Sequence, residues 1–94
     1  MNLKELLSQE SATLVDVREP FEYEAGHVEG SLNIPLGNVA AELERFESMS
    51  KPLILFCRSG GRSGVATKVL QSKGLEDVHN GGGWEGVRDA KNEL

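Results

Sequence analysis

The chain has 94 residues, 38% of them hydrophobic, with a net charge of −5, two histidines and one cysteine. This length suits one small domain, and the acidic balance argues against nucleic acid as a partner, because binding to phosphates needs a basic face. One cysteine forms no internal disulfide, and two histidines make no cluster with zinc-ligand spacing. The sequence has neither a signal-peptide pattern nor a long apolar run. We therefore expect a single domain over residues 1–94, without a metal or a membrane partner, in the cytoplasm, where a thiol stays reduced.

The first part of the chain predicts two short helices and two short strands. Asn2 as an N-cap and Glu5 three residues later form the pattern of a capping box at the start of a helix. Residues 12–17 are rich in β-branched side chains and predict a strand. Pro20 suits the first turn of a second short helix. Residues 31–34 then predict a short extended piece, because the residue before a proline avoids helical geometry.

The second part predicts three helices and two strands. A helix capped by Asn38 leads into a strand over residues 53–57, and the loop after that strand opens into another helix. Residues 75–79 predict a short last strand, and the glycines at 81–83 a flexible turn into a C-terminal helix with Leu94 on its apolar face. Helices alternate with strands and no hairpin signal is present. The sequence therefore predicts an α/β fold, with a small parallel β-sheet flanked by helices on both faces.

The only cysteine lies where the most apolar strand ends and a loop of small and cationic residues begins. Ligands bind beyond the carboxyl ends of the strands in parallel sheets, and Cys57 falls there. Arg58 and Arg62 add positive charge, while Gly60 and Gly61 let backbone N–H groups turn inward. Both influences lower the pKa of a thiol from its usual value of about 8.5. A lone cysteine is more commonly a buried core residue, but a core role does not explain the arginines and glycines that follow.

Four stretches of the chain together resemble the rhodanese sulfurtransferases. Residues 57–63 are similar to the active-site loop of that family, and residues 16–23, 26–35 and 81–84 match further family motifs in the same order. Any one of these matches is weak, but four in register are specific and extend over nearly the whole chain.

The resemblance implies a two-step sulfur transfer. The thiolate of Cys57 would take a sulfane sulfur from a small anionic donor such as thiosulfate and pass it from a persulfide to cyanide or a thiol, including a protein thiol. No metal or organic cofactor is needed for this chemistry. The residues expected to bind the anionic donor and persulfide are those of the loop, namely Arg58, Ser59, Gly60, Gly61, Arg62 and Ser63.

Three further residues are candidates for supporting roles. Asp16 and Arg18 lie at the end of the first predicted strand, and we expect them to brace the loop through an ion pair or backbone hydrogen bonds. His27 is expected to make a hydrogen bond that holds the loop between the strands, in preference to acting as a general base. The sequence assigns no role to His79.

Two other functions remain open at this point. Cysteine phosphatases of related fold are similar in having a cysteine and an arginine in one loop, but they carry five intervening residues and usually a histidine before the cysteine. Here four residues separate Cys57 from Arg62, and Phe56 precedes the cysteine. The third possibility is a binding module or a persulfide carrier dedicated to one protein partner, and the presence of Cys57 favours catalysis over simple binding.

Overall fold

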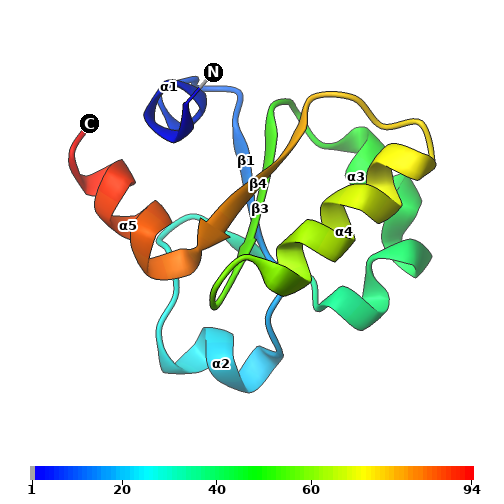
Figure 1. Cartoon of the computed structure of the whole chain (residues 1–94), viewed down its shortest axis with the longest axis horizontal. Coiled ribbons are helices and arrows are strands. Elements are labelled where there is room, and N and C mark those ends of the chain that lie inside the picture. Colours follow the sequence, from blue (N-terminus) through cyan, green and yellow to red (C-terminus); the bar gives the residue numbers. More distant parts are fainter. Residues whose placement is uncertain (1) are drawn as a thin grey trace.

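A computed structural model describes residues 2–94 and shows a four-stranded sheet with helices around it (Figure 1). All three strand pairings are parallel, in the order β2-β1-β3-β4. The strands are β1 (Thr13–Asp16), β2 (Leu32–Asn33), β3 (Leu53–Cys57) and β4 (Val78–Gly83). The helices are α1 (Leu3–Leu7), α2 (Pro20–Ala25), α3 (Leu43–Ser48), α4 (Gly61–Ser72) and α5 (Trp84–Asn92), with two 3-10 turns, η1 (Leu36–Asn38) and η2 (Ala40–Glu42).

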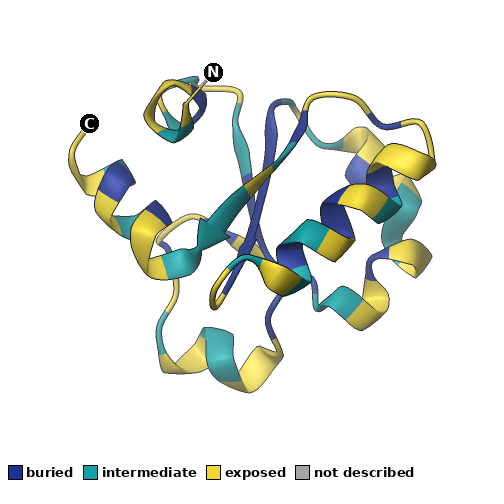
Figure 2. Ribbon diagram, in the orientation of Figure 1, coloured by how far each residue is buried: buried dark blue, intermediate teal, exposed yellow. Residues whose placement is uncertain are grey.

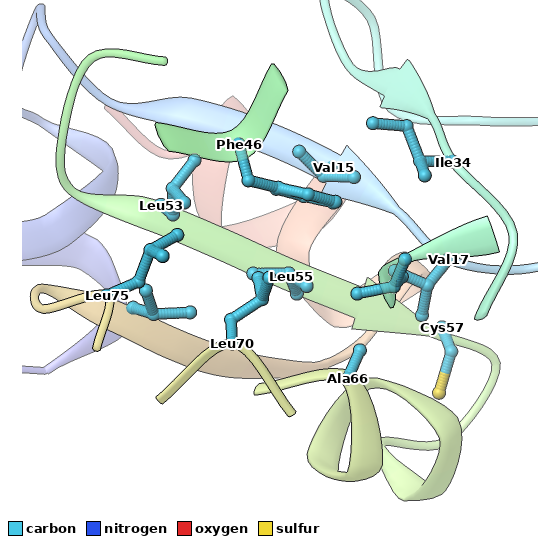
Figure 3. Close-up of a cluster of buried hydrophobic side chains, with 12 residues drawn as sticks. Val15, Val17, Ile34, Phe46, Leu53, Leu55, Cys57, Ala66, Leu70 and Leu75 are labelled. Carbon is cyan, nitrogen blue, oxygen red and sulfur yellow. The ribbon is translucent and has the colours of Figure 1, made fainter. Parts of the chain in front are cut away.

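The central strand β3 divides the hydrophobic core in two, because successive side chains of a strand point to opposite faces. All five of its residues are buried, as the dark blue strand in Figure 2 shows. Leu55 and Cys57 point into a cluster with Phe46 of α3 and residues of α4 (Figure 3). Phe56 lies in the other cluster, with residues of α1 and α5. The predicted parallel sheet with helices on both faces is therefore confirmed.

The start of α1 and the start of α2 lie where the sequence predicts them. Asn2 Oδ1 accepts a hydrogen bond from the Glu5 amide at 2.9 Å, and the Glu5 carboxylate accepts one from the Asn2 amide at 3.3 Å. Pro20 is the first residue of α2. Both signals, the capping box at Asn2 and the proline at position 20, depend only on residues next to the start of the helix, so the sequence is enough to locate them.

The prediction of a helix capped by Asn38 is wrong. The Asn38 amide donates to the Pro35 carbonyl at 2.8 Å, which closes a 3-10 turn instead. A second such turn follows, and α3 begins only at Leu43, without a side-chain cap. Val39, between the two turns, is buried, so tertiary packing holds this segment in tighter turns than its local pattern indicates.

The last strand lies further along the chain than expected, and the predicted flexible glycine turn is part of it. A β-bulge lies between the partners of Leu55 and Phe56 on β3. A Cβ atom on Gly81 would lie 2.9 Å from Ile54 Cγ2, so only glycine allows the close approach of β4 to β3 at this point.

Leu94 was expected on the apolar face of the last helix, but it lies beyond α5 and is 62% exposed.

No helix within residues 2–94 is both long enough and apolar enough to span a bilayer.

Candidate active site

The Cys57 side chain lies at the carboxyl end of β3, in front of the first residues of α4 (Figure 3). Only three residues separate the strand from the helix, and Gly60 makes this sharp turn with a φ of 99°, a conformation that favours glycine. The Cys57 residue is 1% exposed, and its sulfur lies among hydrogen-bond donors. The Gly60 amide is 3.0 Å from Sγ, the Ser63 amide 3.5 Å and the Ser63 hydroxyl 3.4 Å.

These donors make the cysteine more acidic than a free thiol. Burial by itself raises the pKa of the Cys57 thiol, but hydrogen bonds from the Ser63 hydroxyl and from the amides of Ser63, Ser59 and Gly60 outweigh it. They lower the pKa from 9.0 to about 7. The expectation of inward-facing N–H groups is met by this geometry. Of the two loop arginines, Arg62 interacts with the charge of Cys57, which raises the pKa of Arg62, but the hydrogen bonds are the main groups that lower the Cys57 pKa.

The two loop arginines lie in different environments. The Arg62 guanidinium makes a bidentate ion pair with the Glu22 carboxylate of α2, in which Nη1 lies 2.6 Å from Oε1 and Nη2 lies 3.0 Å from Oε2. Hydrogen bonding to Arg62 lowers the pKa of Glu22 from 4.5 to about 2, and the same contact raises the pKa of Arg62. Arg58 is exposed, and its side chain forms no ion pair with any residue from 2 to 94. Arg58 is therefore the loop cation that is free to meet an anion.

A residue that the sequence analysis did not single out holds the loop from β4. Asn80 Oδ1 accepts hydrogen bonds from the Ser63 hydroxyl at 2.7 Å and from the Gly82 amide at 3.0 Å. Its Nδ2 donates to the Gly60 carbonyl at 3.0 Å. Asn80 thus connects the turn after Cys57 to the first turn of α4. Neither Asn80 nor the role of Glu22 carries a local signal, because each acts on residues many positions away.

Asp16 and Arg18 form an ion pair with each other at the end of β1. The Arg18 side chain donates to Asp16 through Nε at 3.0 Å and through Nη2 at 2.7 Å, and both residues are almost fully buried. Arg18 Nη2 also donates to the Gly26 carbonyl at 2.7 Å, and its guanidinium lies 4.6 Å from the ring of Trp84. The expected ion pair is present, but it connects the end of β1 to α2 and α5. Within residues 2–94 neither side chain is hydrogen-bonded to residues 57–63.

The two histidines lie in structural contacts. His27 Nδ1 is 2.8 Å from the Tyr23 carbonyl oxygen, and its ring stacks on the Tyr23 ring with centroids 3.9 Å apart. This hydrogen bond joins α2 to the following turn, within the segment between β1 and β2, and is of the kind expected for His27. His79 Nε2 is 2.7 Å from Asp77 Oδ1 at the surface.

A hollow of about 380 Å³ opens beside the cysteine loop. Its lining residues come from the end of β1, from α2, from the loop and from the start of α5: Arg18, Phe21, Glu22, Ala25, Arg58, Trp84 and Glu85. Phe21 is 72% exposed at its rim. The hollow gives a small molecule room beside the exposed arginine of the loop.

Fold and site together define an α/β protein that holds an acidic, buried cysteine in a cradle of hydrogen-bond donors at the end of a parallel strand. The sequence model of the rhodanese-like domain matches residues 2–90. The chain therefore belongs to the rhodanese-like domain family.

Individual relatives agree with this assignment. The thiosulfate sulfurtransferase GlpE of Pseudoalteromonas translucida is 34% identical over 93 residues, which are 95% of this chain and 88% of that protein. The uncharacterized protein YqhL of Bacillus subtilis is 39% identical over 69 residues, but these make up 73% of this chain and only 54% of YqhL. A structure of an Escherichia coli rhodanese with anions has a TM-score of 0.73 and 32% identity, covering 80% of this chain and 89% of that one.

Proposed function

We propose that this protein is a sulfurtransferase that moves a sulfane sulfur from thiosulfate, or a similar small anion, to a thiophilic acceptor through a persulfide on Cys57. The observation that carries the proposal is the cradle itself. Three donors from Gly60 and Ser63 point at the sulfur, and they hold the thiol pKa at about 7, so that a large fraction is thiolate at neutral pH. The similarity to a thiosulfate sulfurtransferase supports the choice of donor.

The reaction proceeds in two displacements. In the first, the Cys57 thiolate attacks the outer sulfur of thiosulfate, a new S–S bond forms, and sulfite leaves with the electron pair of the bond that breaks. In the second, cyanide or a thiolate attacks the outer sulfur of the persulfide, and the Cys57 thiolate is regenerated as the leaving group. The Cys57 sulfur is the anionic nucleophile in the first step and the anionic leaving group in the second, so the same donors serve both steps.

The two arginines are assigned different roles. Arg58 is exposed beside the hollow, so it attracts the dianionic donor. Arg62 donates two hydrogen bonds to the Glu22 carboxylate, so its main effect is to hold the first turn of α4 against α2. This departs from the sequence-based expectation that both arginines bind the donor.

Intact-mass spectrometry of the protein after incubation with thiosulfate tests the proposal, with Cys57→Ser as the control. We expect the mass of one added sulfur on the native protein, none on the variant, and loss of that sulfur on addition of cyanide with release of thiocyanate. A native fold without any adduct would contradict the thiosulfate reaction and favour a binding module or a carrier loaded by a dedicated protein. Release of thiocyanate from thiosulfate and cyanide by the Cys57→Ser variant at the native rate would contradict the mechanism.

The phosphatase alternative is tested in the same preparation with an aryl phosphate. The shorter loop places two backbone amides and a hydroxyl on the cysteine sulfur itself, which suits a sulfur anion better than a phosphate held beyond it. We expect no hydrolysis above that of Cys57→Ser.

A further inference from the structure

The buried hydroxyl of Ser63 has two acceptors within reach but a single proton to donate. Its Oγ lies 2.7 Å from Asn80 Oδ1 and 3.4 Å from Cys57 Sγ. The Ser63 residue is fully buried, so no bulk solvent reaches the hydroxyl to supply a further donor. Since a hydroxyl donates one hydrogen bond, the oxygen and the sulfur compete for it.

The backbone around Asn80 holds its side-chain amide in one orientation. Nδ2 donates to the Gly60 carbonyl, and Oδ1 accepts from the Gly82 amide, each at 3.0 Å. Turning the amide by half a rotation would bring its NH₂ group against the Gly82 N–H and its oxygen against the Gly60 carbonyl. Asn80 therefore presents its oxygen to the Ser63 hydroxyl, and that oxygen has a second lone pair already used by Gly82.

The charge on the sulfur determines whether the Ser63 hydroxyl donates to Asn80 Oδ1 or to Cys57 Sγ. A neutral thiol is a weak acceptor, so the hydroxyl of Ser63 bonds to Asn80 at the shorter distance of 2.7 Å. A thiolate makes a charge-assisted bond, which is roughly twice as strong as a neutral one. When the hydroxyl turns to the sulfur, Asn80 Oδ1 keeps the hydrogen bond from Gly82, and Asn80 is exposed, so this acceptor is not left without a partner.

We propose that Asn80 is a positioning residue that competes with the Cys57 sulfur for the single hydroxyl proton of Ser63, and thereby controls how strongly the sulfur anion is stabilised. The role of that anion in sulfur transfer rests on the proposed function, whereas the competition itself concerns only the ionisation of the thiol. Asn80 also braces Gly60, whose amide is the nearest donor to the sulfur. Its two contacts therefore act in opposite directions on the thiolate.

The charged groups around the cysteine come from the other elements packed near it. They are the Arg62–Glu22 pair of α4 and α2, Arg58 of the loop, and the buried Asp16–Arg18 pair at the end of β1. The part of β4 beside the loop, residues 80–83, is uncharged. Asn80→Ala and Ser63→Ala therefore change hydrogen bonding near the sulfur without changing any charge.

A double-mutant cycle on the thiol separates the two effects of Asn80. The titration of Cys57 is followed by the pH dependence of its alkylation with iodoacetamide, in the native protein, Asn80→Ala, Ser63→Ala and the double variant; the chain has one cysteine, so the signal is unambiguous. With Ser63→Ala as background, Asn80→Ala only loosens the loop and raises the midpoint. In the native background, where the Ser63 hydroxyl is present, Asn80→Ala also removes the acceptor that competes with the sulfur. The change that Asn80→Ala makes in the Cys57 midpoint is therefore about 0.5–1 pH unit lower in the native background than in the Ser63→Ala background. Additive effects of the two substitutions would overturn the proposal.

A measurement on the unaltered protein tests the proposal even if a variant fails to fold. The side-chain carbonyl ¹³C resonance of Asn80 is recorded across the titration of Cys57, since the carbonyl loses the hydrogen bond from Ser63 when the thiolate forms. We expect this resonance to move with the same midpoint as the alkylation rate and to stay still in Cys57→Ser. A resonance that does not respond to thiol ionisation would overturn the proposal. A protein that transfers no sulfur still gives both results, so failure of the proposed function is distinguishable.

Discussion

The ion pair between Glu22 and Arg62 should make the stability of this protein depend on pH in a defined window. Hydrogen bonding to Arg62 lowers the pKa of Glu22 from 4.5 in the unfolded chain to about 2 in the folded one. The carboxylate therefore contributes stability in full above pH 4.5, and the contribution is lost as the pH falls toward 2. At about 1.4 kcal/mol for each pH unit, this difference gives an upper limit of about 3.5 kcal/mol. The side chains of Arg62 and Glu22 are 35% and 20% exposed, and screening by solvent reduces the expected value to about 1 kcal/mol.

Urea denaturation of the native protein and Glu22→Gln at pH 7, 4 and 3 measures this contribution. Glu24→Gln is the matched control, because Glu24 lies on the same helix, is exposed, and forms no ion pair within residues 2–94. We expect Glu22→Gln to lose about 1 kcal/mol at pH 7, with most of that loss remaining at pH 4 and less than half of it at pH 3, while Glu24→Gln stays within about 0.5 kcal/mol throughout. A loss that does not change between pH 7 and pH 3, or one matched by Glu24→Gln, would refute the reasoning.

Three further predictions concern the loop and its neighbours. Alkylation of Cys57 should rise with a midpoint near pH 7, in line with a thiol pKa of about 7, and a midpoint above pH 8.5 would show that the cradle does not stabilise the thiolate. Gly83→Ala should lower the free energy of unfolding by about 1–3 kcal/mol in urea denaturation, because its Cβ would lie 2.8 Å from the Arg58 carbonyl oxygen. Gly86→Ala is the control, since nothing lies within 4 Å of that Cβ, and a helix favours alanine, so no loss is expected. Arg58→Ala should reduce kcat/KM for thiosulfate by up to about tenfold and for an uncharged donor much less, with the exposed Lys68→Ala as control; equal losses for both donors would argue against a charge role.

Local signals in the sequence were enough to locate the cysteine and the sheet around it. The apolar run that ends on Cys57 predicts a buried strand, and the glycine and serine residues after it predict a turn. Strand β3 and the loop could therefore be predicted from a few neighbouring residues. The alternation of such strands with helix signals was enough to predict a parallel sheet, because parallel strands need crossover connections. The capping box at Asn2 is local in the same way.

The elements that were predicted wrongly are those in which distant residues outweigh the local pattern. Glycines at 81–83 have the pattern of a turn, yet they form a strand because β4 must pass close to β3 and to the loop carbonyl of Arg58. The segment after Pro35 forms 3-10 turns because Val39 is buried in the core.

The loop sequence was enough to predict backbone N–H groups around Cys57, since glycine and serine residues after a buried strand favour a tight turn into a helix. Only the tertiary structure decided how the charges and polar side chains are distributed around it. It brings Glu22 to Arg62 across 40 positions of the chain and Asn80 to Ser63 across 17, so that one arginine is neutralised and the hydroxyl beside the sulfur is shared. Such pairings depend on which strands and helices lie side by side, and a sequence pattern that describes neighbours along the chain contains no information about them.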